Sequence, residues 1–371
     1  MLKPPAQSIS IALATYNGAK FIEAQLQSFA DQELLPAELV VTDDGSSDDT
    51  LEKIRSFGKS APFPVQIHRN ETQLGFRRNF LKAAALCTSE IVAYSDQDDI
   101  WHTNKLKRVE QAFESPETLL VHHNARVVDA AGQFIRDLHP AHCFASIVKP
   151  MDGSPWVSPF GFATSFRTRL MKFLPLHGLS VDTYHPGEPL AHDQWVTFLA
   201  SALGCKAYIE EPLVDYRQHG ANTFGVPRKA GQSLLERMHL KLEDRSEVFA
   251  RLEQAASINA NIMAQVAAST DLSSLEKMRA QEASERWEAL EALYALRTAA
   301  YTSPSLLRRA DAVSRLTHLG AYGRAATWSF GKKSQARDIL LGIMAGPLIT
   351  KLGARQSDRD PGLQALRPLH A

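Results

Sequence analysis

Ser8-Ile9-Ser10-Ile11-Ala12-Leu13-Ala14 is a short, apolar stretch that breaks at Tyr16-Asn17-Gly18. An apolar run of this length that ends in turn-forming residues predicts a buried strand followed by a turn. The apolar residues that come next recur at helical spacing and are Phe21, Ile22, Leu26 and Phe29. The chain is therefore expected to begin with a strand, a turn and a helix.

The same alternation continues through residue 115. Further strands are predicted at Leu39–Thr42, Val65–His68 and Ile91–Tyr94, and each is followed by a helical pattern. Such alternation predicts an α/β fold with a mostly parallel sheet and helices on both faces. Ligands of these sheets bind beyond the carboxyl ends of the strands. The segments YNG, DDGSS and DQDD lie at three of these ends, so we expect the site there.

The pattern changes after residue 115. Strands are predicted at Leu119–His122, Arg126–Val128 and Ala207–Ile209, a strand with a loop within Trp156–Phe166, and a helix over Asp193–Leu203. From about residue 225 the chain is rich in Ala, Glu, Leu and Arg, with apolar residues at helical spacing. We predict two domains, an α/β domain over residues 1–225 and a helical C-terminal region over residues 226–371.

The composition limits the classes of partner. Lys and Arg together number 41, as do Asp and Glu, so the formal net charge of the 371 residues is zero. A neutral chain is not built to coat nucleic acid, and a charged ligand must be recognised by a local patch. The three cysteines lie far apart, which is typical of free thiols in a reducing compartment.

We expect a cytoplasmic protein that can touch the membrane from the inside. The N-terminus lacks a signal-peptide pattern, and the longest nearly apolar run, Ile339–Ile349, is shorter than the ~20 residues that span a bilayer. Ser303–Arg355 has nine basic and two acidic residues, a net charge of +7, interleaved with apolar residues. This surface can lie on anionic lipid beside a lipid-linked acceptor. A helical bundle with a solvated basic face explains it equally well.

The strongest chemical signal is Ser95–Asp99, SDQDD, which follows an apolar strand directly. Three carboxylates within four residues repel one another, and a divalent cation removes that repulsion. Mg²⁺ and Mn²⁺ bind hard oxygen ligands, often one or two carboxylates together with substrate phosphates. We predict a Mg²⁺ or Mn²⁺ site here. The alternative is a solvated loop whose Asp residues cap the next helix.

Two other loops point to a nucleotide. In Asp43–Thr50, DDGSSDDT, the Asp44 carboxylate is predicted on a base edge or a ribose hydroxyl, and a capped strand-to-helix turn is the alternative. In Ala14–Gly18, ATYNG, Tyr16 can stack on a base, although a core tyrosine is the commoner role. We expect the carboxylates near positions 44 and 98 to meet around one cation that binds a diphosphate.

Two downstream motifs complete the candidate chemistry. Asp193 in HDQW, residues 192–195, is a candidate general base for an acceptor hydroxyl, and it can also serve as the N-cap of its helix. Arg217 and His219 in YRQHG, residues 216–220, are candidates for holding a departing diphosphate. A lone histidine is more often structural, and that alternative stays open for His219.

Taken in order, these segments resemble family 2 glycosyltransferases of the GT-A fold over about residues 8–225. The matching segments are ATYNG, VVTDDGSSDDT, QLGFRRNF, IVAYSDQDDIW, HDQW and YRQHGAN. The DQDDIW and YRQHG forms are similar to bacterial rhamnosyltransferase-like members that build surface polysaccharides. The resemblance implies a doubly wound, mostly parallel sheet. It also implies inverting sugar transfer from a nucleoside-diphosphate donor, with dTDP-rhamnose as one candidate, to a saccharide or lipid-linked acceptor hydroxyl.

The resemblance implies a role for each motif residue. The nucleotide-sugar contacts would come from Ala14, Tyr16, Asp44, Arg77 or Arg78, and Asp96. Asp98 and Asp99 would compete as ligands of the metal, Asp193 would be the catalytic base, and His219, with Arg217, would lie beside the metal or diphosphate. The chain has His192 where the family often has Glu, and it lacks the Q-x-x-R-W motif of processive synthases. One sugar is therefore expected per encounter.

Two other classes of protein compete with this interpretation. A nucleotidyltransferase that makes sugar nucleotides would use a similar sheet and metal, but ATYNGAKF lacks the usual Gly-rich loop with Arg and Lys. A non-catalytic sugar-binding or partner-binding module would need no carboxylates at three strand ends. A dinucleotide dehydrogenase is disfavoured because no G-x-G-x-x-G follows the first strand.

Overall fold

A computed structural model describes residues 8–219, 245–323 and 328–344. These residues form two compact units. The first contains residues 8–150, 156–177 and 190–219, and the second contains residues 151–155, 178–189 and the helices from residue 245 onward. The domain boundary predicted at residue 225 lies outside the described residues and stays a prediction.

The first unit is built on a ten-stranded sheet with the order β3-β2-β1-β4-β9-β6-β10-β5, in which β7 pairs with β6 and β8 with β10. The strands are β1 (Ile9–Thr15), β2 (Glu38–Asp43), β3 (Val65–Arg69), β4 (Ile91–Ser95), β5 (Ile100–Trp101), β6 (Thr118–Val128), β7 (Phe134–Asp137), β8 (Ile147–Val148), β9 (Thr164–Arg167) and β10 (Cys205–Arg217). The neighbours β3, β2, β1 and β4 are parallel, which confirms the predicted parallel sheet. Beyond β4 the sheet is mixed, because β9 runs antiparallel to β4 and β6.

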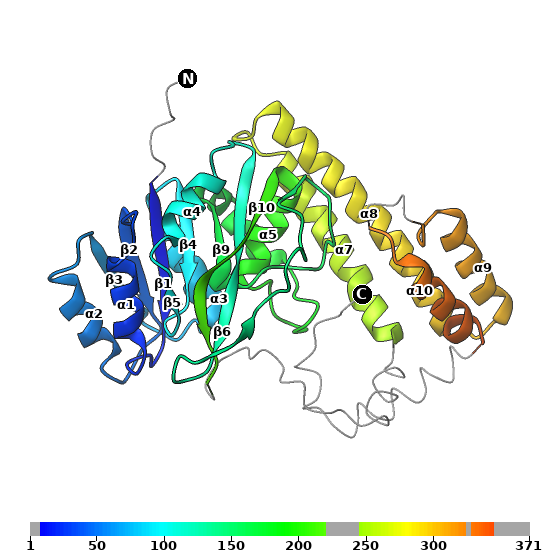
Figure 1. The fold of residues 1–371 in the computed structure, drawn as a ribbon. Helices are drawn as coiled ribbons and strands as arrows, with labels where there is room; N and C mark the ends of the chain where they lie inside the picture. The colour runs from blue at the N-terminus through cyan, green and yellow to red at the C-terminus, as the bar shows by residue number, and fades with distance from the viewer. Residues whose placement is uncertain (1–7, 220–244, 324–327, 345–371) are drawn as a thin grey trace. The chain divides into compact units, whose positions relative to one another are not determined.

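Helices cover both faces of this sheet (Figure 1). They are α1 (Ile22–Ala30), α2 (Thr50–Gly58), α3 (Gly75–Leu86), α4 (Lys105–Ala112) and α5 (His192–Leu203). Side chains alternate along a strand, so neighbours face opposite layers. Ile11 and Leu13 join the buried cluster that contains Phe29 of α1. On the opposite face, the Tyr94 ring lies 5.6 Å from the ring of Phe80 in α3.

Two strands are longer than the sequence predicts. β6 continues through His123 and Asn124, where these polar residues predict a gap between two strands. They pair with Ile209 and Pro212 of β10, which carries the ladder past the end of the pairing with β9 at His122. β10 extends far beyond Ala207–Ile209, with register shifts on both sides of Pro212. Its length brings Arg217 to the same end of the sheet as the acidic loop after β4.

The second unit is helical, as predicted for the C-terminal region. It contains α7 (Arg245–Ala267), α8 (Ser274–Thr302), α9 (Leu306–His318), α10 (Gly331–Arg337) and a π-helical turn over Asp338–Ile343. The Asp338 carboxylate is fully buried and accepts two hydrogen bonds from Arg297, at 2.9 and 3.0 Å, and one each from Tyr301 and Tyr322. This network joins the π-helical turn to α8. Within the described ranges, no helix has both the length and the apolar character to cross a bilayer.

Candidate active site

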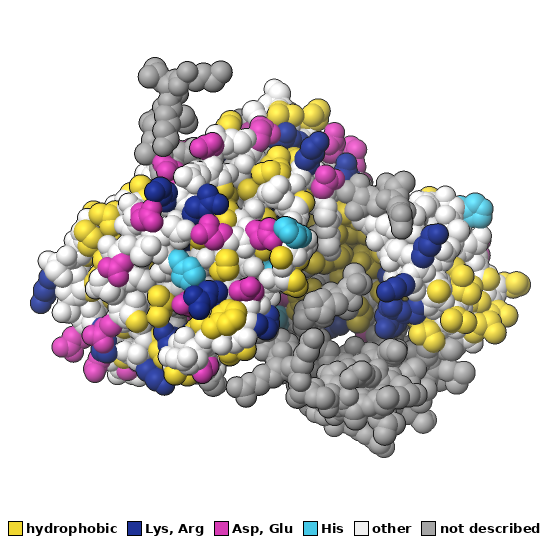
Figure 2. All heavy atoms as spheres, viewed as in Figure 1, with side chains coloured by type: hydrophobic (Ala, Val, Ile, Leu, Met, Phe, Trp, Pro, Cys, Tyr) yellow, Lys and Arg dark blue, Asp and Glu magenta, His cyan; other side chains and the backbone are white. Residues whose placement is uncertain are grey.

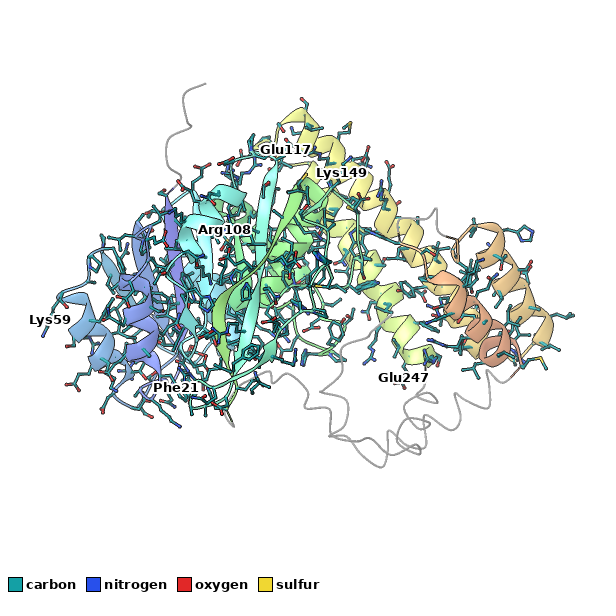
Figure 3. All side chains as sticks on the ribbon, viewed as in Figure 1. Phe21, Lys59, Arg108, Glu117, Lys149 and Glu247 are labelled. Carbon is teal, nitrogen blue, oxygen red and sulfur yellow. The ribbon has the colours of Figure 1, made fainter. Side chains whose placement is uncertain are left out.

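The candidate site lies at the carboxyl ends of β1, β2 and β4. Figure 3 shows Phe21, just after β1, at the opposite end of the sheet from Glu117, which precedes β6. The loop after β1 is bonded to the loop after β2, because the backbone N–H groups of Asn17 and Gly18 donate to Ser46 Oγ at 2.9 Å and Thr50 Oγ1 at 2.8 Å. The loops that are separate motifs in the sequence therefore form one surface.

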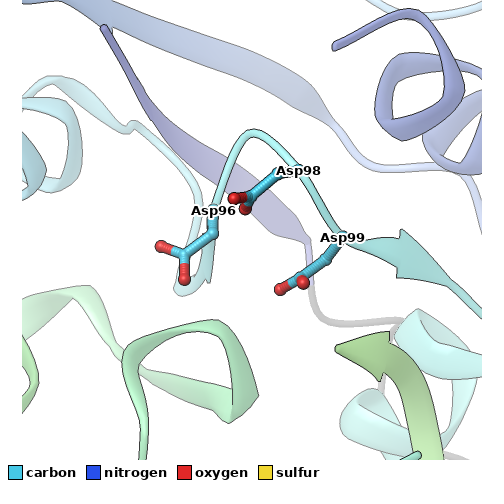
Figure 4. A group of neighbouring side chains, drawn as sticks. All are labelled: Asp96, Asp98 and Asp99. Carbon is cyan, nitrogen blue, oxygen red and sulfur yellow. The ribbon is translucent and has the colours of Figure 1, made fainter. Parts of the chain in front are cut away.

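Asp96, Asp98 and Asp99 form an acidic cluster on the loop after β4 (Figure 4). One carboxylate oxygen from each lies within 4.8 Å of the others. Asp99 is only 1% exposed, and its Oδ1 accepts a hydrogen bond from the Arg217 N–H at 3.1 Å. Among the residues that the structure describes, its Oδ2 has no hydrogen-bond partner. A buried carboxylate oxygen without a donor is costly unless a cation or proton occupies the site. These three residues therefore fit a hard divalent cation.

The electrostatics of the cluster support the same conclusion. Burial, followed by the charges of Asp98 and Asp193, raises the pKa of Asp96 to about 8. Burial and the neighbouring carboxylates raise the pKa of Asp99 well above its ordinary value. A nearby cation would reverse this trend, because it favours the ionised form of each carboxyl group.

Lys105 is a buried cation near this cluster that the sequence analysis missed. Its Nζ donates to the carbonyl of Phe162 at 2.9 Å and lies 3.5 Å from the centre of the Trp101 ring. Burial lowers the pKa of Lys105 well below its ordinary value, and the charges of Asp99 and Asp96 oppose that shift. Lys105 lies in α4 beyond the acidic motif, and a lysine in a helix is usually exposed, so no local signal marked it.

Arg217 and His219 contact the acidic loop from the end of β10. Arg217 Nε donates to the backbone carbonyl of Asp98 at 3.0 Å, and its Nη1 donates to that of Ala130 at 3.1 Å. His219 Nε2 lies 2.8 Å from Asp98 Oδ2. Phe21 stacks on the His219 ring at 4.6 Å and lies under the Arg217 guanidinium. The structure thus brings both residues to the acidic cluster; their contact with a diphosphate stays a prediction.

Asp44 does not join the acidic cluster, which corrects the expectation that the carboxylates near 44 and 98 meet around one cation. Its Oδ1 accepts the Leu74 N–H at 2.7 Å and the Asn70 side-chain amide at 2.8 Å, and its Oδ2 accepts the Gly75 N–H at 2.8 Å. Leu74 and Gly75 lie at the start of α3, and Asn70 follows β3 directly. Asp44 is 4% exposed and joins β2 to that helix. Its contact with a base or ribose stays a prediction.

The other nucleotide candidates lie around the same end of the sheet. The Tyr16 side chain is exposed, whereas Ala14 is buried in β1 with its backbone in register with Thr42. On α3, Arg77 is buried and Arg78 is exposed. Burial, followed by the charge of Arg77, lowers the pKa of His192 to about 3, so Arg77 lies toward the start of α5.

Asp193 lies in the first turn of α5. The helix begins at His192 and its N-cap is Ala191, so the alternative that Asp193 is the N-cap is wrong. The capping bond comes from Gln194 Oε1, which accepts the Ala191 N–H at 2.7 Å. Burial and the charge of Asp98 contribute most to the raised pKa of Asp96, and the charge of Asp193 contributes after them. Asp193 is thus near enough to Asp96 for their charges to interact.

Residues 10–173 match the family model described as glycosyl transferase family 2. An uncharacterized glycosyltransferase of Nostoc is 26% identical over 226 residues, which are 58% of this chain and 66% of that protein. The dTDP-rhamnosyl transferase RfbG of Shigella flexneri is 35% identical over 99 residues, which are 26% of this chain and 34% of that protein. The matched segments thus span between about a third and two thirds of these relatives.

The crystal structure of S. aureus TarS 1–349, solved in complex with UDP-GlcNAc, has a similar fold. The TM-score is 0.50 at 15% sequence identity, and the alignment covers 94% of this chain and 92% of that chain. At this level of identity the likeness concerns the fold alone. It agrees with the mostly parallel sheet followed by a helical region.

Proposed function

Because residues 10–173 match the model of glycosyl transferase family 2, we propose that the chain transfers a sugar from a nucleoside diphosphate to an acceptor hydroxyl, with inversion at the anomeric carbon. The observation that supports this best is the proximity of Asp193 to the cluster of Asp96, Asp98 and Asp99. Inverting displacement requires a base on the acceptor side and a charge-stabilising site on the leaving-group side. A single sheet edge supplies both.

Asp98 and Asp99 would hold the divalent cation, Mg²⁺ or Mn²⁺. When bound, such an ion neutralises charge on a departing diphosphate. His219 holds Asp98 Oδ2 at 2.8 Å, and the Arg217 N–H holds Asp99 Oδ1, so both ligand side chains are oriented before the ion arrives. Arg217 and His219 would then line the diphosphate site. Asp96 would face the ribose from the first position of the motif.

The remaining residues would bind the donor and activate the acceptor. Tyr16 would stack on the base, with Ala14 and Asp44 beside it and Arg77 or Arg78 at its edge. Asp193 would accept the proton of the acceptor hydroxyl as the oxygen attacks the sugar. It lies in the first turn of α5, where the helix N-terminus favours negative charge.

Variants of the two key carboxylates test this assignment. Asp193→Asn is expected to lower transfer by about 10²–10⁴-fold while donor binding persists. Asp98→Asn is expected to weaken both transfer and metal-dependent donor binding. The matched control is Asp311→Asn, an exposed site on α9. Full transfer activity in either variant would refute the role given to that residue.

The donor class is tested without an acceptor. Sugar nucleotides, including dTDP-rhamnose, are screened with Mg²⁺ or Mn²⁺ for slow hydrolysis and thermal stabilisation of the protein. The segment similar to RfbG makes dTDP-rhamnose our first candidate, and assembly of a surface polysaccharide or glycolipid our candidate process. Release of pyrophosphate from a nucleoside triphosphate would instead favour a nucleotidyltransferase. Binding of a sugar nucleotide without turnover would favour a non-catalytic module.

The proposal extends to contact with the cytoplasmic face of an anionic membrane. In the second unit, exposed apolar side chains lie on α9, just after it, and along the π-helical turn: Leu306, Leu307, Leu319, Ile339, Leu340 and Met344. Leu307 is 81% exposed and Met344 is 72% exposed. Exposed basic residues of α9 are Arg308 and Arg315, and those of α10 are Lys332 and Lys333. Figure 2 shows hydrophobic side chains gathered over α9 with Lys and Arg beside them. The predicted contributions of Arg324, Lys351 and Arg355 lie outside the described residues.

Co-sedimentation of the full chain with phosphatidylcholine vesicles, with and without phosphatidylglycerol, tests this contact. Binding is expected only with the anionic lipid and should fall with salt, since each surface Lys or Arg contributes about 1 kcal/mol. The double variant Leu307→Glu, Leu340→Glu should lose binding. Leu35→Glu, at an exposed leucine of the first unit, should not. Equal sedimentation of the double variant and the parent protein would rule out a lipid-binding role for this surface.

A further inference from the structure

We propose that Gln97 is a positioning residue that couples cation binding to recognition of the nucleotide base. Gln97 lies between Asp96 and Asp98 in the acidic loop, yet its side chain points to the loop after β1. The identity of the two ligands, a cation and a nucleotide, rests on the proposed function. The contact between Gln97 and Tyr16 does not depend on it.

The Gln97 amide binds the backbone of Tyr16 on both sides. The Tyr16 N–H donates to Gln97 Oε1 at 3.0 Å, and Gln97 Nε2 donates to the Tyr16 carbonyl at 3.0 Å. The side-chain amide thus pairs with Tyr16 as a neighbouring peptide group would in a sheet. β1 and β4 are already in register up to Leu13 and Ser95, and Gln97 continues the connection beyond the end of that pairing.

Gly18 leaves room for this contact. A Cβ atom at Gly18 would lie 2.2 Å from Gln97 Oε1 and 2.5 Å from its Cδ, which is too close for any packed side chain. An alanine at this position would therefore displace the Gln97 amide from Tyr16. The requirement for glycine comes from Gln97, and it disappears when Gln97 is shortened.

The contact between Gln97 and Tyr16 links the proposed cation site to the residue proposed to stack on the base. The Tyr16 side chain is 46% exposed, and its backbone is held by a residue covalently joined to two carboxylates of the cluster. A cation held by Asp98 and Asp99 would fix the main chain of Asp98 and, through it, that of Gln97. The Tyr16 backbone, and with it the direction of the ring, is then ordered before the nucleotide arrives.

The first test uses a nucleoside, which has no phosphate to touch the metal. NMR titrations measure the affinity of the protein for thymidine and for uridine, once with Mg²⁺ and once without it. Mn²⁺ is absent from both samples. In the parent protein Mg²⁺ should tighten nucleoside binding about fivefold, the lower end of ordinary coupling between sites. In Gln97→Leu the affinity should not respond to Mg²⁺. An unchanged Mg²⁺ effect in Gln97→Leu, or none in the parent protein, would overturn the coupling. A parent protein that binds neither nucleosides nor nucleotides would overturn the proposed function as well.

The second test needs no ligand. Gly18→Ala should lower the melting temperature of the parent protein by roughly 2–4 °C, and should have no effect in a Gln97→Ala background. Gly178→Ala is the matched control, because a Cβ there meets no atom of the described part of the chain within 4 Å. Equal destabilisation by Gly18→Ala in both backgrounds would show that Gln97 does not hold this loop. The stability test thus reports on the contact of Gln97 with the loop, and the nucleoside titration reports on the effect of that contact on base binding.

Discussion

Asp96 should make the metal-free protein less stable as the pH rises. Its pKa is raised to about 8 in the folded protein, against an ordinary value of 3.8. At a pH between these two values, the Asp96 carboxyl group is therefore protonated in the folded state and ionised in the unfolded state. Stability is fully present below the ordinary pKa and is lost as the pH rises through the folded pKa. At 1.36 kcal/mol per pH unit, the loss has an upper limit of about 6 kcal/mol.

Urea denaturation in EDTA at several values between pH 5 and pH 8.5 measures this effect. Relative to Asp96→Asn, the parent protein should lose at least about 1.4 kcal/mol over that range, the equivalent of a single pH unit. The amide of Asp96→Asn does not titrate, so this variant keeps only the pH dependence of the other groups. Burial lowers the pKa of His122 and His192 to about 3, so both groups add stability as the pH rises through their ordinary value of 6.5. They do so in the parent protein and the variant alike, and the difference between the two proteins isolates the effect of Asp96. Asp311→Asn is the control.

The same experiment with Mg²⁺ reverses the trend. A cation competes with the proton, so stabilisation by Mg²⁺ should grow as the pH rises. The reasoning is refuted if the parent protein and Asp96→Asn lose stability in parallel between pH 5 and pH 8.5 without metal. It is equally refuted if Mg²⁺ stabilises the protein most at pH 5.

Three other perturbations have defined outcomes. Gly161→Ala would place a Cβ 2.3 Å from Nε2 of the buried His192 ring, so it should lower the free energy of unfolding in urea by about 1–3 kcal/mol. It should also lower sugar transfer more than donor affinity, and unchanged transfer would contradict this. Arg217→Lys keeps the charge but loses the guanidinium N–H groups that donate to the carbonyls of Asp98 and Ala130. Calorimetry should then show that the protein binds the metal about 10–100-fold more weakly, and an affinity equal to that of the parent protein would contradict the role of Arg217. Asp338→Asn would leave the buried Arg297 without its carboxylate partner, so it should lower the free energy of thermal unfolding by about 3–5 kcal/mol. Nucleotide affinity in the first unit should not change. A loss below 1 kcal/mol, about that for an exposed ion pair, would contradict the prediction.

Much of the first unit was predictable because its signals are local. The apolar runs at Ile9–Thr15 and Ile91–Ser95 are buried strands, and the motif residues follow them directly in the chain. Parallel strands bring their carboxyl ends to one edge, so adjacency in sequence predicted adjacency at the site. The acidic cluster was found for the same reason, since all three of its carboxylates lie within four residues.

Predictions that depended on distant partners were less complete. Two polar residues predicted a break in β6, but β10 continues the ladder through them. Asp44 was grouped with the metal site because both are acidic loops. Its donors, however, lie 26 to 31 residues further along the chain, just after β3 and at the start of α3. The first residue of α5 was placed one position too late, because the side chain that caps it belongs to Gln194.

The sequence by itself determined the order of strands and helices, the parallel half of the sheet and the loops that carry the carboxylates, because hydrophobic periodicity and chain connectivity are properties of short segments. Only the tertiary structure decided which of those carboxylates share a site and what surrounds them. Gln97 reaches back 81 residues to Tyr16, and Arg217 reaches back 118 residues to Asp99. Contacts of that range depend on strand register and loop closure across the whole sheet, which no local pattern encodes.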